Sequence, residues 1–347
     1  MRLVTIRPRT GVEVAASDHQ AAILLQGGRI LTIGALVEIA PSELPSEFGR
    51  ASLAELFEVD PGFGQIRAAL ELASPGAIEA ASIEPASVRL AAPIPRPGKI
   101  VGVGYNYLEH VREQGRERPA RPVLFSMFAN AVIGDGEAIR KPAGTHALDL
   151  EAELAVVIGR RASRVPANRA LDYVAGYTAA NDVTARDWQG QARALRPGEQ
   201  GDGQWLRAKG SDTFLPLGPC LVTTDELSDG RGRAVRSWLT ARPEATGLHA
   251  ASPIQMQNGN TADLMFGVAE LIGLISAEVT LDPGDVIVTG TPSGVGVFRE
   301  PPLFLEPGDL VRVEVEAIGG LTSPVTDADG RVPDGSPAAR FLAEAAG

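Results

Sequence analysis

The sequence is poor in the residues that build disulfide frameworks and zinc sites. It has one cysteine, Cys220, and four histidines in 347 residues. A single cysteine cannot form an internal disulfide and is typical of a reducing compartment, so we expect a cytoplasmic protein. So few histidine and cysteine side chains also leave little from which a zinc site could be built.

Positive charge and long apolar runs are scarce as well. The chain carries 32 Lys and Arg against 43 Asp and Glu, a formal net charge of −11. Such a chain has no basic surface for a phosphate backbone, and we expect no nucleic acid partner. No stretch approaches the roughly 20 apolar residues of a membrane span, and no N-terminal segment reads as a signal peptide, so no membrane association is expected. An anionic substrate would need local positive charge from Lys, Arg or a metal.

Several common catalytic motifs are missing. GVGYNY has Tyr107 where a dinucleotide fingerprint needs its third glycine. TGTPSGVG lacks the Lys-Ser/Thr of a phosphate loop and reads as a sharp loop after a strand. There is no Gly-x-Ser-x-Gly elbow and no His-Glu-x-x-His. NAD-dependent, P-loop, serine hydrolase and zincin chemistries are therefore not indicated.

The organisation of the chain changes near residue 95. Strand-like MRLVTIRP is followed by QAAILLQGGRILTIG, where Gly27-Gly28 predicts a hairpin turn. Apolar spacing predicts helices around residues 53–57 and 66–72. The proline-rich LAAPIPRPGK then marks a boundary. We expect a smaller N-terminal α+β accessory domain over residues 1–95 and a larger domain over 96–347.

The larger part is dominated by strands. The clearest are KIVGVG, ELAVVIG, YVAGYTAANDV, LPLGPCLVT, DVIVTGTP and LVRVEVEAIG. One helix is predicted over residues 261–276, with Thr261 as its cap and an apolar stripe from Leu264 to Ile275. Without a regular βαβ alternation, this predicts an α+β fold that is mostly β, a mixed or antiparallel roll with few helices.

Paired acidic residues stand out in LDLEAELAVVIGRR, residues 148–161. Glu151 and Glu153 project from the same face of a predicted strand, and Asp182 lies at the end of another. Three oxygen ligands suit Mg²⁺, Mn²⁺ or Ca²⁺ rather than zinc. The pair alone also fits the solvent face of an edge strand, because exposed carboxylates outnumber metal ligands.

Further polar residues accompany the acidic ones. His110 and Glu113 lie three apart on a predicted helical turn, where the carboxylate can hold the imidazole so that it takes a proton from water. Lys209 could hold an oxyanion or be a surface ammonium. Arg186 and Gln189 would lie near any metal that Asp182 binds.

Taken in order, these segments resemble the fumarylacetoacetate hydrolase family over about residues 97–327. The resemblance is carried by KIVGVGYNYLEHVREQG, LDLEAELAVVIG, GYTAANDVTARDWQ, AKGSDTFLPLGP, QNGNTADLMF and LDPGDVIVTGTPSGVG. It implies a mixed β-sandwich roll as the catalytic domain. Many members of the family are dimers, so a homodimer is expected.

The resemblance also implies roles for individual residues. Glu151, Glu153 and Asp182 would bind Mg²⁺ or Mn²⁺, with Ca²⁺ as a further candidate, and the substrate would be a small anionic 2-oxo or β-diketo acid. His110, oriented by Glu113, would activate water for C–C bond hydrolysis, releasing a carboxylic acid and an enolate such as that of pyruvate. The remaining implied roles are oxyanion stabilisation by Lys209 together with Gln189, and substrate binding by Tyr105, Arg186, Gln189, Thr289, Gly290 and Thr291.

Other reactions remain open on the same residues. Relatives with this metal cluster are hydratases, decarboxylases or isomerases of 2-oxo acids, and a catalytically silent binding protein is a further alternative. The presence of both His110 and Glu113 favours water activation. Residues 225–256 depart from the family because they lack its Asn-Gly-Glu turn. The arginines of this segment could be solvated or could line a pocket for a larger acidic substrate: Arg231, Arg233, Arg236 and Arg242.

Overall fold

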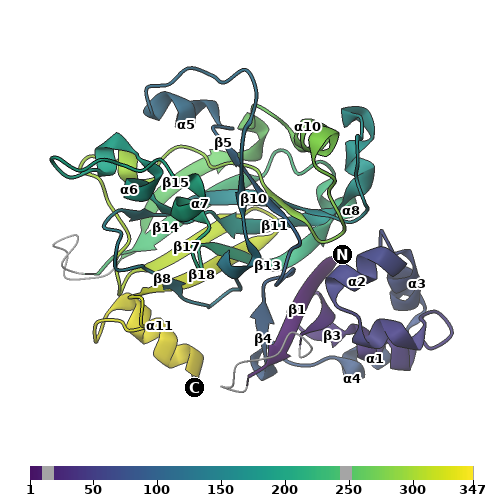
Figure 1. Ribbon diagram of the computed structural model, residues 1–347. Coiled ribbons are helices and arrows are strands. Elements are labelled where there is room, and N and C mark those ends of the chain that lie inside the picture. Colours follow the sequence, from purple (N-terminus) through teal and green to yellow (C-terminus); the bar gives the residue numbers. More distant parts are fainter. Residues whose placement is uncertain (10–18, 243–251, 347) are drawn as a thin grey trace.

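A large mixed sheet forms the centre of the molecule. The computed structural model describes residues 1–9, 19–242 and 252–346. The strands of the large sheet are β1 (Arg2–Pro8), β2 (Gln20–Leu24), β3 (Ile30–Thr32), β4 (Val88–Ala91), β5 (Ile100–Gly104), β6 (Val123–Met127), β7 (Val132–Ile133), β10 (Ala152–Ile158), β11 (Val174–Asn181), β13 (Leu215–Thr223) and β16 (Val286–Val288). Their order is β3-β2-β1-β13-β11-β10-β16-β5-β6, while β4 pairs with β1 and β7 with β13 (Figure 1).

A smaller sheet packs against the middle of the large one. Its strands are β8 (Ile139–Arg140), β14 (Ala234–Thr240), β15 (Ile254–Asn260), β17 (Leu310–Val315) and β18 (Gly319–Thr326), in the order β15-β14-β17-β18-β8. Strands β14, β17 and β18 contact β10, β11 and β13. Every residue of β10 and β11 is buried, which explains why both strands read as nearly continuous apolar runs. A short ladder of β9 (Leu148–Asp149) and β12 (Thr184–Ala185) leads into them.

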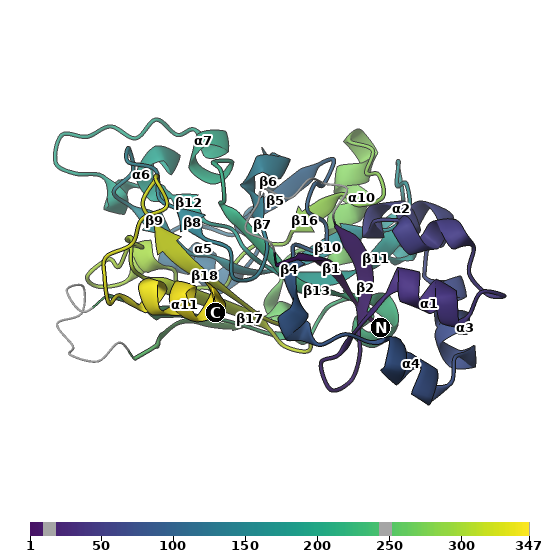
Figure 2. The ribbon, with the colours of Figure 1, turned by 90° about the horizontal axis from the view of Figure 1, so that it is seen from below.

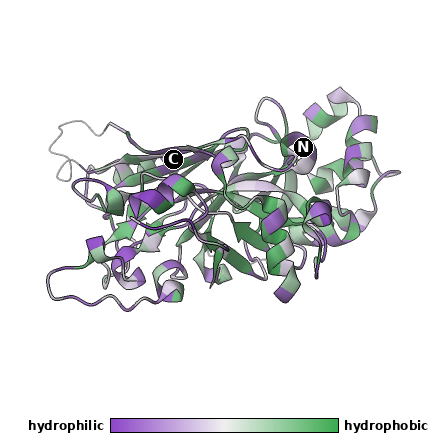
Figure 3. Ribbon diagram, turned by 90° about the horizontal axis from the view of Figure 1, so that it is seen from above, coloured by the Kyte–Doolittle hydropathy of each residue, from purple (hydrophilic) through white to green (hydrophobic). Residues whose placement is uncertain are grey.

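Helices surround the sheets and are few in the larger part of the chain. Four early helices lie together beside β1 to β3: α1 (Ile33–Ile39), α2 (Leu53–Val59), α3 (Gly64–Leu72) and α4 (Pro75–Ala81) (Figure 2). The later ones are α5 (Leu108–Glu113), α6 (Arg186–Gln189), α7 (Trp205–Lys209), α8 (Thr224–Leu227), α10 (Val268–Glu278) and α11 (Pro337–Ala346). Hydrophobic residues gather in the central strands, whereas the outer helices and loops mix both kinds (Figure 3). The predicted α+β, mostly β fold is confirmed.

The N-terminal segment shares the large sheet with the rest of the chain. Strand β1 pairs with β13 through Arg2 and Leu3, and it also pairs with β2 and β4 along its length. The predicted hairpin forms between β2 and β3, where the Gly28 N–H donates to Leu25 O at 3.1 Å. A domain boundary near residue 95 stays a prediction.

One predicted helix begins later than expected. Helix α10 starts at Val268, and residues 261–263 form a separate 3₁₀ turn capped by Asn260, so the prediction of Thr261 as the helix cap is wrong. The backbone N–H groups of Met265 and Phe266 donate to Asn106, which holds this stretch against the segment after β5. Those donors belong to a tertiary contact that apolar spacing cannot reveal.

The segment that departs from the family pattern still contributes two paired strands. β14 and β15 are antiparallel neighbours, and residues 243–251 between them lie outside the described part. Arg236 pairs with Glu314 and Arg242 with Asp309, and none of the segment's four arginines lines the cavity described below. Within the described ranges, no helix is both long and apolar enough to cross a membrane.

Candidate metal centre and active site

Three carboxylates converge where β10 begins and β11 ends. Glu151 directly precedes β10, Glu153 lies within it and Asp182 directly follows β11. The two strands are antiparallel, with Ala152 opposite Asn181, so the start of one lies beside the end of the other. Oxygen atoms of the three carboxylates lie within 4.8 Å of one another, and all three side chains are buried. The burial excludes the solvent-exposed strand edge as an explanation of Glu151 and Glu153.

Two buried cations face these carboxylates. Lys209, at the end of α7, donates from Nζ to Glu151 Oε2 at 2.8 Å and to Asp182 Oδ2 at 2.6 Å. Nη2 of Arg186, the first residue of α6, lies 2.7 Å from Glu151 Oε1. Burial raises the pKa of Glu151, but the charges of Lys209 and Arg186 outweigh it and lower the pKa to about 2. Glu151 is therefore ionised at neutral pH.

The other two carboxyl groups are harder to ionise. Burial, together with the negative charges of Asp182 and Glu151, raises the pKa of Glu153 well above its ordinary value. Burial also raises the pKa of Asp182, and Lys209 offsets only part of this, leaving it at about 6. Asp182 Oδ1 is buried without a hydrogen-bond partner in the described part of the chain. Carboxylate oxygens are hard donors, the kind that Mg²⁺, Mn²⁺ and Ca²⁺ prefer. The unpartnered oxygen of Asp182, together with the carboxyl groups of Glu151 and Glu153, therefore fits such a divalent cation.

Asp149 supports this arrangement from behind and was missed by the sequence reasoning. Its carboxylate is fully buried. Oδ2 accepts from Arg186 Nε at 2.9 Å and from the Val297 N–H at 3.0 Å, and Oδ1 accepts from the N–H groups of Leu150 and Gly296. Asp149 thus fixes Arg186 between itself and Glu151. The only signal in the sequence was a third acidic residue two positions before Glu151.

The His110 and Glu113 pair forms as predicted on helix α5. His110 Nδ1 lies 2.6 Å from Glu113 Oε1, and the Gly294 N–H donates to Glu113 Oε2 at 3.0 Å. A carboxylate oxygen can only accept, so Nδ1 carries the proton and Nε2 is left as the basic nitrogen. His110 is buried and lines the same cavity as Glu151.

The loop after β16 closes on Glu153. The Gly290 N–H donates to Glu153 Oε2 at 2.6 Å. Gly290 has a φ of +99°, and a Cβ there would lie 2.8 Å from Asn106 Cβ, so glycine is required. The hydroxyl groups of Thr289 and Thr291 donate to backbone oxygens of β10. Of these three loop residues only Thr291 lines the cavity, and their predicted grip on a substrate carboxylate stays a prediction.

A small cavity connects these groups to the surface. Its free volume is about 30 Å³, close to one water molecule's share of liquid. It is lined by Val103, Gly104, Tyr105, His110, Gln114, Phe125, Glu151, Glu153, Asp182, Arg186, Gln189, Trp205, Lys209 and Thr291. Trp205 meets the ring of Tyr105 edge-on at 5.9 Å between centroids and lies 5.3 Å from that of Phe125. The predicted residues Tyr105, Arg186 and Gln189 are thus in the wall, whereas Trp205, Phe125 and Gln114 were missed because nothing in their local sequence marks them.

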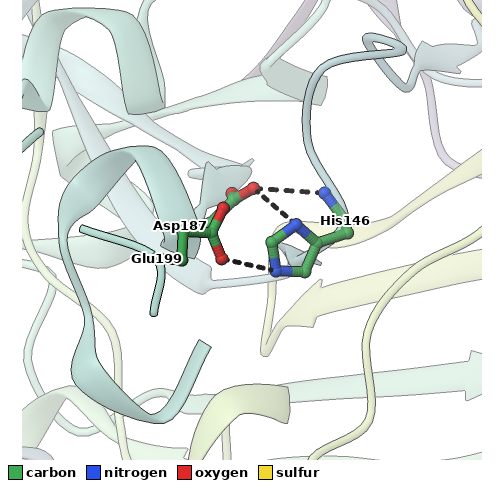
Figure 4. Close-up of side chains that lie close together, drawn as sticks. All are labelled: His146, Asp187 and Glu199. Carbon is green, nitrogen blue, oxygen red and sulfur yellow. Dashed lines mark hydrogen bonds and ion pairs between the residues drawn. The ribbon is translucent and has the colours of Figure 1, made fainter. Parts of the chain in front are cut away.

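A second cluster lies outside this cavity. Figure 4 shows the two ring nitrogens of His146 facing the carboxylates of Asp187 and Glu199, with Nδ1 at 3.2 Å from Asp187 Oδ2 and Nε2 at 3.4 Å from Glu199 Oε2. Nε2 also lies 2.9 Å from Ala194 O, and Asp187 accepts from the Thr145 hydroxyl at 2.6 Å. These contacts tie the segment after α6 to the chain before β9. The chain itself satisfies both ring nitrogens of His146.

Comparisons with known proteins identify the family of this chain. A family model described as fumarylacetoacetate (FAA) hydrolase, C-terminal, matches residues 99–326. The chain belongs to the fumarylacetoacetate hydrolase family. The match contains every site residue described above.

Relatives of this family fall into more than one reaction class. Mitochondrial oxaloacetate tautomerase fahd2 of Xenopus laevis is 42% identical over 239 residues, which are 69% of each chain. A solved 5-carboxymethyl-2-hydroxymuconate delta-isomerase from Mycobacterium smegmatis is 32% identical, with a TM-score of 0.65 over 94% of this chain and 99% of that one. A fumarylacetoacetate hydrolase from psychrophilic Exiguobacterium antarcticum is 27% identical, with a TM-score of 0.70 over 94% and 99%. These names support an enzyme of 2-oxo acids and leave hydrolysis unconfirmed.

Proposed function

We propose that the protein is a divalent-cation-dependent enzyme that interconverts the keto and enol forms of a small 2-oxo acid. The observation that carries the proposal is that three buried carboxylates and His110, which Glu113 holds, line the same small cavity. Acidic ligands and a basic nitrogen in one cavity are the two elements that enolisation of a 2-oxo acid needs.

Glu151, Glu153 and Asp182 would hold the cation. The cation, when bound, would polarise the 2-oxo group of the substrate and so make the adjacent C3–H bond more acidic. The pairs that Lys209 forms with Glu151 and Asp182 keep these carboxylates aligned while the site is free of substrate. Lys209 Nζ also donates to the Thr184 hydroxyl at 2.9 Å, so all three of its N–H donors are engaged and it would stabilise a developing enolate oxygen through its positive charge.

His110 would move the proton. Glu113 holds Nδ1–H, which directs Nε2 to the C3 hydrogen as the acceptor in one direction and the donor in the other. Arg186 and Gln189 lie in the wall and are joined by a hydrogen bond of 3.2 Å, so they can orient the substrate carboxylate together. The aromatic side chains of Trp205 and Phe125 exclude water from the reacting carbon.

The names of relatives support tautomerisation first. The Xenopus laevis protein is named an oxaloacetate tautomerase and the Mycobacterium smegmatis structure a delta-isomerase, and both activities move a proton next to a carbonyl. Hydrolysis of a C–C bond in an acylpyruvate is the second candidate. It is favoured by the short contact between His110 and Glu113, an arrangement that also suits activation of water.

Proton exchange at C3 tests the proposal. The purified protein with Mn²⁺ should speed the exchange of the C3 hydrogens of oxaloacetate in deuterated water, followed by NMR against a protein-free blank with the same Mn²⁺. His110→Ala should lower the rate by about 10²-fold or more. Glu109→Ala, on the exposed side of the same helix, should keep it.

The same preparations separate the two candidate reactions. Release of pyruvate from an acylpyruvate without C3 exchange of oxaloacetate would favour the hydrolase. Exchange that survives chelation of the metal or replacement of His110 would refute the roles given to them.

A further inference from the structure

The segment that ends helix α5 carries an arginine in a fixed position. The Gly115 N–H donates to Arg112 O at 2.9 Å and the Arg116 N–H donates to Val111 O at 3.1 Å, the two hydrogen bonds of a Schellman motif. Gly115 has a φ of +65°, the left-handed conformation that this motif needs. The backbone of Arg116 is therefore held by the same helix that carries His110 and Glu113 (Figure 1).

The guanidinium group of Arg116 does not itself line the active-site cavity but lies beside a residue of its wall. Its Cζ is 5.2 Å from the centre of the Tyr105 ring, and Tyr105 lines the cavity. Gln114, two residues before Arg116, lines it as well. The Arg116 side chain is exposed, so its guanidinium group is accessible to a solute that reaches the cavity beside Tyr105.

Arg116 differs from the other cations near the site because it has no carboxylate partner in the described part of the chain. Lys209 pairs with Glu151 and Asp182, and Arg186 pairs with Asp149 and Glu151. Arg112, on the same helix, pairs with Glu109. A substrate that brings a second carboxylate finds the inner cations already engaged, whereas Arg116 keeps its donors free for a bidentate contact.

We propose that Arg116 binds the distal carboxylate of the substrate and so selects dicarboxylic 2-oxo acids over monocarboxylic ones. The inference rests on the proposed function, in which the first carboxylate and the oxo group lie at the inner end of the cavity. Arg118 provides a matched control: it is also exposed and lies over the ring of Phe266, at 6.0 Å, and Phe266 does not line the cavity.

Two substrates of equal carbon number test the selection. Oxaloacetate carries a distal carboxylate, and 2-oxobutanoate ends in a methyl group instead. C3 exchange rates with Mn²⁺ give kcat and KM for both in the wild type, Arg116→Gln, Arg116→Lys and Arg118→Gln. Arg116→Gln should raise the KM for oxaloacetate by about tenfold or more, which is the range of a lost charge-assisted hydrogen bond. The KM for 2-oxobutanoate should change much less.

The controls separate this inference from the proposed function. Arg116→Lys should recover part of the loss, because charge is kept and the bidentate geometry is not. Added salt should raise the KM for oxaloacetate more in the wild type than in Arg116→Gln. Equal effects of Arg116→Gln on both substrates, or an equal effect of Arg118→Gln, would overturn the role of Arg116 alone. A wild type that exchanges neither substrate would overturn the proposed function and this inference with it.

Discussion

Replacing Asp149 by Asn removes one buried charge and leaves the shape of the side chain nearly unchanged. Each carboxylate oxygen of Asp149 accepts two hydrogen bonds: Oδ1 from Leu150 and Gly296, Oδ2 from Arg186 and Val297. Whichever way the asparagine amide is turned, its NH₂ group faces two donors. Two buried N–H groups therefore lose their acceptor, and Arg186 loses one of its two negative partners.

The size of the effect follows from these contacts. A buried donor without an acceptor costs about 1–3 kcal/mol, and removal of one partner of a buried ion pair costs about 3–5 kcal/mol. The cost of the unpaired donors and the cost of the broken ion pair count partly the same contacts and are not added. We therefore expect the Asp149→Asn variant to lose about 3–5 kcal/mol of its free energy of unfolding. Arg186 should then lean towards Glu151 and compete with a cation, weakening Mn²⁺ binding by about 10–100-fold.

Asp309→Asn is the matched control. Asp309 is also a buried carboxylate that accepts backbone N–H groups, those of Arg242 and Glu306, and it does not line the cavity. Its replacement should reduce stability without changing Mn²⁺ affinity. Urea unfolding gives the stability of both variants and calorimetry gives the affinity. A loss below about 1 kcal/mol for Asp149→Asn, or equal changes of affinity in both variants, would refute the role given to Asp149.

Two further predictions concern the carboxylates and the loop beside them. Metal binding requires ionised ligands, so the apparent Mn²⁺ affinity should rise as the pH passes the pKa of Asp182, at about 6, and the raised pKa of Glu153. Binding should release protons, which calorimetry in two buffers detects. Because the folded metal-free chain holds these protons more tightly than the unfolded chain, its free energy of unfolding should fall over the same rise in pH. A Mn²⁺ affinity that does not depend on pH would contradict both expectations. Gly290→Ala should destabilise the protein by about 1–3 kcal/mol, since the new Cβ would lie 2.8 Å from Asn106 Cβ in a left-handed backbone. Gly76→Ala is the control, because a Cβ at that position has no atom within 4 Å. Equal unfolding midpoints for the two variants would show that the loop can relax.

The elements that carry the acidic residues could be predicted from the sequence. Strands β10 and β11 are buried along their whole lengths, and both read as apolar runs, the first with acidic residues at its start and the second followed by Asp182. The pairing of Ala152 with Asn181 then places Glu151 opposite Asp182, and this follows once the two runs are neighbours in one sheet. The His110 and Glu113 contact is local, within one turn of helix, and could be predicted for the same reason.

The remaining features depend on contacts between distant parts of the chain. Lys209 was predicted to stabilise an oxyanion, but its pairing with both Glu151 and Asp182 requires α7 to fold back over the sheet end. Trp205 lines the cavity for the same reason. Asp149 carries no local mark of its role, because three of its four donors come from α6 and from the loop after β16. No periodicity in the sequence encodes such contacts.

Calorimetric titration with Mn²⁺ tests the central claim most directly, since the two acidic clusters of the described chain predict different outcomes. We expect one tight ion for each chain, lost in Asp182→Asn and retained in Asp187→Asn, whose carboxylate belongs to the cluster around His146. Unchanged stoichiometry and affinity in Asp182→Asn, or loss of the ion in Asp187→Asn alone, would contradict the assignment of Glu151, Glu153 and Asp182 as the metal centre.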